Sequence, residues 1–304
     1  MIKTTSTTTR SARTARTALA GPVTAVLNTA SGSVEPGAAA RMKAIFKDAG
    51  LDHARIVEAG ADDIEAAVAE AVASAGVIVV LGGDGTIRTA AGSCGRCRKL
   101  IIPLPGGTMN MLPHALYGAH PWAQVLADTL AAPMVRTVSG GRIGDQTFYC
   151  AAILGAPSLW ADAREAVRHG HLIEAVKRSA VAIEHSGEPL QYRLGEGPEG
   201  QAQAVAVICP LVSSALSSDA PALEAAALDP EAATGLFSLA YHAVFDDWRN
   251  DPSVSLARVR QVDLRAPGRI PAILDGEKAH LGRRGRVTFL PRAFRALVPA
   301  KARP

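Results

Sequence analysis

The strongest chemical signal in the chain is the stretch Gly82-Gly83-Asp84-Gly85-Thr86, which directly follows an apolar run at residues 77–81. A continuous β-branched run is typical of a strand buried on both faces of a parallel sheet. Ligands of such sheets bind at the carboxyl ends of the strands. Three glycines within four positions allow backbone N–H groups to approach a phosphate, and a following helix N-terminus adds positive partial charge. The stretch therefore predicts a phosphate site; the structural alternative is a tight βα turn in which Asp84 only caps a helix.

A second glycine-rich loop follows another apolar run, at residues 100–104. It reads Pro105-Gly106-Gly107-Thr108-Met109-Asn110. On its own it could be a helix cap and a turn. Two such loops at the ends of neighbouring parallel strands would lie side by side at one edge of the sheet, which suits a nucleoside triphosphate. Neither loop is a Walker A motif, because no Gly-Lys-Ser/Thr follows.

Two further segments complete a recognisable order along the chain. The first expected strand, at residues 23–28, ends in Asn28 followed by Ser31-Gly32, and Leu274-Asp275-Gly276-Glu277 lies near the C-terminus. By itself Asp275-Gly276 predicts a hairpin turn. All four segments together resemble the diacylglycerol kinase catalytic-domain family, which includes sphingosine and ceramide kinases and is related in fold to NAD kinases. The resemblance covers residues 22–299.

The resemblance implies a phosphotransferase that moves the terminal phosphate of ATP, bound with Mg²⁺, onto a lipid hydroxyl. Glu277 would accept the proton of that hydroxyl with the support of Asp275, and Asp84 would stand among the phosphates. Phosphoryl transfer requires this combination of positioning, charge neutralisation and proton removal. No metal held by the protein itself is predicted, because residues 229–237 match the family's Asp-rich segment poorly. The nucleotide would be bound by Asn28, Ser31, Gly32, Gly82, Gly83, Asp84, Gly85, Thr86, Gly107, Thr108 and Asn110.

Several positions depart from the family pattern. Arg88 and Thr89 stand where the family commonly has Asn and Glu, and Met111 stands where it has an acid. In the second loop Gly106 replaces a leucine. These departures leave two alternatives open: a kinase for a soluble hydroxyl compound, like NAD kinase, or a nucleotide-binding sensor without catalysis.

The spacing of apolar residues predicts how these segments are positioned. Strand-like and helix-like runs alternate over residues 22–132, which predicts a Rossmann-like, three-layer α/β domain with a parallel sheet. Short β-rich runs dominate residues 133–290 and predict a second, mainly antiparallel β-sandwich domain that binds the acceptor. Within it we expect a helical insertion at 157–185 and a long loop at 213–233. The flanks are a disordered basic arm at 1–21 and a segment at 291–304 that returns to the first domain.

Charge and composition narrow the partners. The net charge is +4, but residues 1–34 and the chain after Glu277 carry basic residues and no acid. Such ends could contact an anionic membrane surface, or could simply be solvated. Aromatic residues make up only 4% of the chain and no DNA-reading motif is present, so nucleic acid is not expected. No stretch is long and apolar enough to span a bilayer. We expect a cytoplasmic protein with a lipid substrate, with peripheral membrane contact and a homodimer as options.

Overall fold

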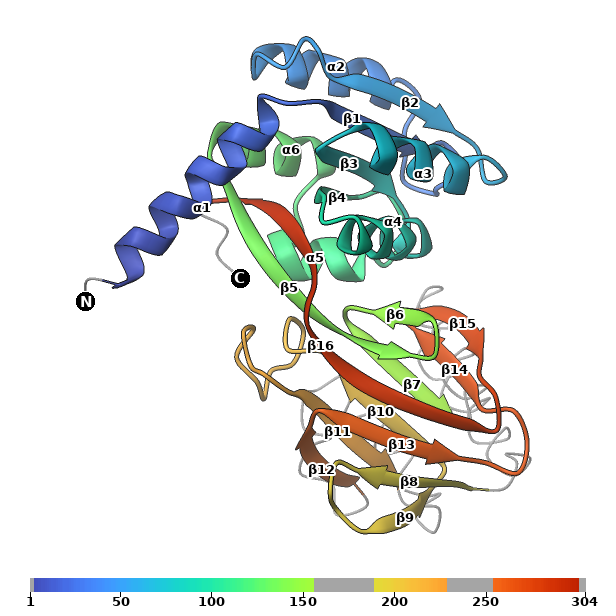
Figure 1. The fold of residues 1–304 in the computed structure, drawn as a ribbon. Coiled ribbons are helices and arrows are strands. Elements are labelled where there is room, and N and C mark those ends of the chain that lie inside the picture. The colour runs from blue at the N-terminus through green and yellow to red at the C-terminus, as the bar shows by residue number, and fades with distance from the viewer. Residues whose placement is uncertain (1–2, 156–188, 229–253, 301–304) are drawn as a thin grey trace. The chain divides into compact units, whose positions relative to one another are not determined.

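The computed structural model describes residues 3–155, 189–228 and 254–300 (Figure 1). The chain forms two compact units. One combines Met1–Gly140 with Leu290–Pro304, and the other is Gly141–Phe289. The predicted boundaries were 132/133 and 290/291, whereas the units divide at 140/141 and 289/290. The expected insertion at 157–185, the end of the expected loop at 213–233 and the Asp-rich segment at 229–237 lie outside the described residues.

The first unit contains a parallel sheet in the order β2-β1-β3-β4, which β16 extends by parallel pairing with β4 at Arg295 and Ala296. Every residue of β1, β3 and β4 is buried, because helices cover the sheet. Helix α3 packs beside α4, and α2 beside α6. The strands are β1 Val23–Asn28, β2 Arg55–Ala59, β3 Val77–Gly82 and β4 Leu100–Pro105; the helices are α2 Ala38–Asp48, α3 Ile64–Ser74, α4 Asp84–Arg96, α5 Met111–Tyr117 and α6 Trp122–Ala131.

The second unit contains two groups of antiparallel strands. One has the order β12-β11-β10-β7-β14-β15, and the other joins β16, β13, β8 and β9; β5 pairs with β16 and forms a hairpin with β6. The bounds are β5 Pro133–Ile143, β6 Gln146–Phe148, β7 Ala151–Gly155, β8 Leu190–Leu194, β9 Glu199–Ala202, β10 Ala204–Ile208, β11 Leu223–Leu228, β12 Val254–Val259, β13 Gln261–Arg265, β14 Pro271–Leu274, β15 Glu277–His280 and β16 Arg284–Pro299.

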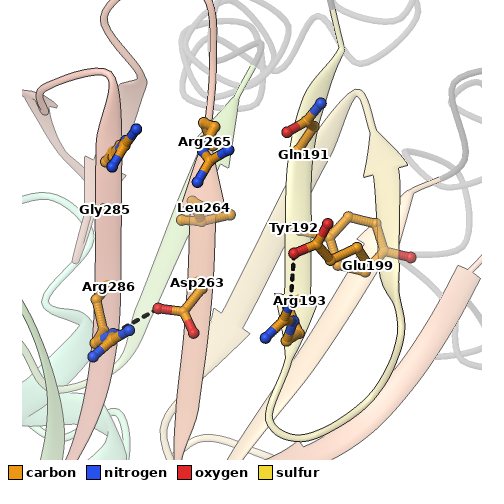
Figure 2. Close-up of a pocket in the computed structure, with 10 residues that line it drawn as sticks. Gln191, Tyr192, Arg193, Glu199, Asp263, Leu264, Arg265, Gly285 and Arg286 are labelled. Atoms are coloured by element: carbon orange, nitrogen blue, oxygen red, sulfur yellow. Dashed lines mark hydrogen bonds and ion pairs between the residues drawn. The ribbon is translucent and has the colours of Figure 1, made fainter.

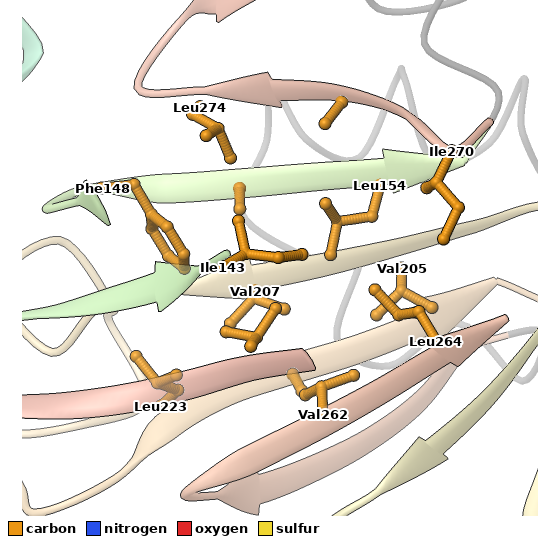
Figure 3. Packing of buried hydrophobic residues seen from close by; sticks show 14 of the residues in the cluster. Ile143, Phe148, Leu154, Val205, Val207, Leu223, Val262, Leu264, Ile270 and Leu274 are labelled. Carbon is orange, nitrogen blue, oxygen red and sulfur yellow. The ribbon is translucent and has the colours of Figure 1, made fainter. Parts of the chain in front are cut away.

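Side chains from both groups of strands share one core. Figure 3 shows Leu154 and Val205 of one sheet packing with Val262 and Leu264 of the other. Alternate residues of each strand point into this core, as expected for two stacked sheets. The predicted fold class is therefore confirmed: an α/β unit with a parallel sheet and a second, antiparallel β-sandwich unit.

The N-terminal arm differs from the expectation of disorder. Lys3–Leu19 form helix α1. Ala15 and Leu19 are buried, and the Ser11 hydroxyl donates to the Val135 carbonyl at 2.8 Å and accepts from the Val135 N–H at 2.9 Å. The Thr- and Arg-rich sequence has weak helical preference, so packing against β5 is what stabilises the helix. No helix in the described parts of the chain is long and apolar enough to cross a membrane.

Candidate nucleotide-binding site

The loops that follow β1, β3 and β4 meet at one edge of the parallel sheet. These strands are direct neighbours, so their carboxyl ends lie together. The Gly106 N–H donates to the Gly82 carbonyl at 3.0 Å, and the Ser33 N–H donates to the Gly106 carbonyl at 3.0 Å. The structure thus brings together the three segments that the sequence predicted to share a site.

Glycine is required where the two glycine-rich loops touch. A Cβ atom at Gly107 would lie 2.7 Å from the Gly83 Cα, and one at Gly106 would lie 2.8 Å from the Gly82 nitrogen. Both neighbours are backbone atoms that cannot rotate away. Any side chain at these positions would force the loops apart.

Side chains of the first loop hold the other two in place. The Ser31 hydroxyl accepts a hydrogen bond from the Gly83 N–H at 3.0 Å, and the Asn28 amide donates to the Thr86 hydroxyl at 2.9 Å. The Ser33 hydroxyl donates to the Gly107 carbonyl at 2.9 Å. Ser33 was not predicted as a site residue, because a bond to a carbonyl 74 residues away leaves no local pattern.

Asp84 caps a helix, but not its own. Its carboxylate is buried and accepts hydrogen bonds from the N–H groups of Asn110 at 3.0 Å and Met111 at 2.7 Å, where α5 begins. Asn110 has a left-handed backbone with φ 51°, and its amide bonds both the N–H and the carbonyl of Gly107 at 2.8 Å. Asp84 therefore fixes the second glycine loop against the first, through contacts that both its oxygens make.

The chain after the first loop is anchored by Glu35. Its carboxylate accepts a hydrogen bond from the Trp122 indole at 3.1 Å and forms an ion pair with Arg41 at 3.4 Å. Burial works to raise the pKa of Glu35, but hydrogen bonds from the backbone, Trp122 and Arg41 outweigh it and lower the pKa. A negative charge on Glu35 is thus favoured, and it holds residues 28–34 toward α6.

The assembled edge offers donors suited to an anion. The first intrahelical bond of α4 runs from the Ile87 N–H to the Gly83 carbonyl at 3.0 Å, so the N–H groups of the preceding turn have no carbonyl within the helix. Such a helix N-terminus binds phosphate readily. Gly32 and Thr108 are exposed beside it, and a small groove of about 80 Å³ is lined by Ile64, Glu65, Val68, Gly85, Thr86 and Thr89.

The remaining predicted site residues belong to the second unit. Asp275 and Gly276 are the two turn residues of the β14–β15 hairpin, with φ 48° and 85°. Positive φ at both positions is the geometry of a type I′ turn. Glu277 begins β15 and is half-buried. Within the described chain, no hydrogen bond or ion pair engages the Glu277 carboxylate.

The Asp275 carboxylate ties this hairpin to the start of β7. It is 4% exposed and accepts hydrogen bonds from the N–H groups of Tyr149 at 2.7 Å, Cys150 at 2.8 Å and Ala151 at 3.0 Å. The Asp275 N–H donates to the Ala151 carbonyl at 2.9 Å. Burial, and then the charge of Asp275, raise the pKa of the nearby Cys209 thiol. Asp275 is therefore placed to shape the turn that carries Glu277.

Solved structures show the same fold. Three structures from Bacillus anthracis str. Sterne, all described as diacylglycerol kinases and two of them only provisionally, superpose with TM-scores of 0.70, 0.71 and 0.67. They are 15–16% identical, and each alignment covers 93% of this chain and 98% of the other. No curated protein matches the chain in sequence.

The family model of the diacylglycerol kinase catalytic domain matches residues 22–143. This stretch contains all three loops of the candidate site. The resemblance inferred from the motifs is confirmed, and together with the fold it supports a kinase-type function.

We predict that Gly107→Ala separates the two glycine loops. The added methyl group would overlap Gly83, so the free energy of unfolding should fall by about 1–3 kcal/mol and nucleotide binding should be lost. Urea denaturation and fluorescence titration with ATP would measure both. The matched control is Gly60→Ala, since a Cβ there meets nothing within 4 Å. Equal behaviour of the two variants would contradict the close packing.

We predict that Asp275→Asn destabilises the protein although asparagine tolerates the left-handed turn. The amide has one acceptor oxygen for three N–H donors, so about 3 kcal/mol should be lost. Asp145→Asn is the control, because Asp145 lies in the two-residue turn between β5 and β6 with an exposed side chain. Similar urea midpoints for the two variants would show that the carboxylate of Asp275 holds nothing in place.

Proposed function

We propose that the protein is an ATP-dependent lipid kinase, which transfers the γ-phosphate of MgATP to a hydroxyl group of a diacylglycerol-like or sphingoid lipid. The main support is the edge of the parallel sheet, where three loops bonded to one another present the N-terminus of α4. The match of residues 22–143 to the diacylglycerol kinase catalytic domain supports the same activity.

The residues of this edge fit a triphosphate. Gly83, Gly106 and Gly107 keep side chains out of the surface, and the N–H groups at the start of α4 favour negative charge. Bound Mg²⁺ would neutralise part of the phosphate charge and accompany the nucleotide. Groups of three or more acidic, His or Cys side chains placed for a metal ion are absent from the described residues. Asp84, with its oxygens bonded to Asn110 and Met111, acts in this proposal as a positioning residue.

Glu277 is our candidate for the group that accepts the proton of the lipid hydroxyl. Of the three predicted acids, Asp84 and Asp275 accept backbone N–H bonds, while Glu277 has no hydrogen-bond or ion-pair partner in the described chain. A general base must be able to exchange a proton with substrate, so the unengaged carboxylate suits this role best. Asp275 would act through the turn that it fixes.

The substrate class can be tested with the purified protein and ATP labelled at the γ-phosphate. Incubation with a membrane lipid extract should label a lipid, and incubation with NAD should give no labelled product. Labelled NAD would replace our proposal with a kinase for a soluble hydroxyl compound, which Arg88 and Thr89 on α4 left open. ATP binding without turnover on either acceptor would instead indicate a nucleotide sensor.

We predict that Glu277→Gln lowers kcat by about 10²–10⁴-fold, because the amide cannot accept the hydroxyl proton. ATP binding should stay unchanged, since the nucleotide loops lie in the other unit of the chain. Glu58→Gln on β2 is the control: it removes an exposed acid and should leave turnover as it is. A fully active Glu277→Gln variant would rule out Glu277 as the base.

A further inference from the structure

A polar groove lies on the sheet of the second unit that contains β16, β13, β8 and β9. Its volume is about 480 Å³ (Figure 2). Val262 and Leu264 of β13 point into the core, so Asp263 and Arg265 point to the opposite face of the sheet. The groove is lined by Gln191, Tyr192, Arg193, Glu199, Asp263, Leu264, Arg265, Arg284, Gly285 and Arg286.

One cross-strand row of this groove is electrically neutral. Arg286 lies opposite Asp263, Asp263 opposite Arg193, and Arg193 opposite Glu199. Arg286 donates to Asp263 at 2.6 Å, and Arg193 pairs with Glu199. Burial would raise the pKa of Asp263, but hydrogen bonds from Arg286 and Gln261, with the charge of Arg193, lower it overall. Both acids in this row are therefore occupied by their own arginines.

The next row, two residues along the strands, is not neutral. Arg284 lies directly opposite Arg265, and Gln191 lies on the other side of Arg265. The strands carry no acid in this row, and neither arginine has an ion-pair or hydrogen-bond partner in the described parts of the chain. Like charges directly opposite each other on paired strands destabilise a sheet. The row therefore combines two positive charges with a neutral amide donor, at a cost to stability.

The chemistry of this row matches a phosphate group. A guanidinium group offers planar, paired N–H donors that bind phosphate oxygens two at a time. Two such groups side by side could neutralise the single charge of a phosphate diester or both charges of a monoester, and Gln191 could donate to a further oxygen. Both arginines are exposed at the groove, so a ligand can reach them.

We propose that Arg265 and Arg284 form a phosphate-binding site on this sheet, for a phosphate carried by an anionic lipid headgroup or by a small soluble ester. The ligand would relieve the repulsion between the two arginines. This site is separate from the predicted nucleotide site, whose residues belong to the other unit, and its occupation requires no phosphoryl transfer. Its test can therefore fail or succeed whatever the outcome of the kinase assay.

The test measures binding to the full chain in the absence of ATP. One arm is co-sedimentation with phosphatidylcholine vesicles with and without phosphatidylglycerol. The other is the thermal midpoint in inorganic phosphate compared with chloride at equal ionic strength. The double variant R265Q/R284Q should bind whichever probe the site accepts, the phosphatidylglycerol vesicles or inorganic phosphate, about thirty-fold more weakly. Each basic side chain near a phosphate contributes on the order of five-fold to such binding.

The control variant K43Q/K47Q removes the same charge from exposed positions on helix α2. It should bind like the wild type. Loss in the vesicle arm alone would assign the site to a lipid headgroup, and loss in the phosphate arm would assign it to a soluble phosphate. Equal loss of binding in both variants would mean that net charge, and not this site, drives the binding. No loss of binding in R265Q/R284Q would refute the site.

Both arginines are exposed, and R265Q/R284Q removes their repulsion, so in chloride this variant should unfold at the same temperature as the wild type or higher. If it does not fold, Arg284→Gln alone tests the same row, at the first residue of β16. A lower midpoint in chloride for a folded variant would mean that the arginines stabilise the sheet, and would contradict a site kept for a ligand.

Discussion

The carboxylate of Asp84 is the contact on which the candidate nucleotide site depends. Asp84 is the first residue of α4, and its carboxylate accepts hydrogen bonds from the first N–H groups of another helix, α5. The two glycine loops can touch only because Gly106 and Gly107 lack side chains, and Asp84 then fixes the distance between them. The N-terminus of α5 carries positive partial charge, which attracts an anion. The carboxylate of Asp84 therefore also neutralises one of the two helix N-termini at this edge.

The second unit uses the same device at a different place. Asp275 accepts three backbone N–H groups from residues 149–151 and fixes a two-residue turn. A short carboxylate suits this task, because it has few rotatable bonds to restrict and several lone pairs to offer. In both units an aspartate next to a glycine, Asp84 or Asp275, therefore shapes the backbone. Proton transfer is left, in our proposal, to the longer Glu277 beside the fixed turn.

These contacts mark the limit of what the sequence could predict. The buried strands β3 and β4 were predictable from runs of β-branched residues, and the meeting of the loops followed from parallel pairing. The tasks of Asp84 and Asp275 were not predictable, since their partners are N–H groups that almost every residue carries, 26–27 and 124–126 positions away. Helix α1 was missed for a similar reason: the burial of Ala15 and Leu19 and the hydrogen bonds of Ser11 to Val135, 124 positions away, favour it over disorder.

The departures from the family pattern can now be weighed by what each position does. Met111 replaces an acid, yet only its backbone N–H meets Asp84, so the tie between the loops survives the change. Gly106 is different, because a leucine there would collide with the Gly82 nitrogen and with Val34. A loop that carries leucine must stand further from Gly82 than the loop in this chain does. The glycine thus lets residues 105–110 lie closer to β3, which changes the shape of the surface next to α4 while the bonds that assemble it remain. Of the departures at residues 106 and 111, Gly106 therefore has the stronger physical reason to alter which nucleotide or acceptor fits.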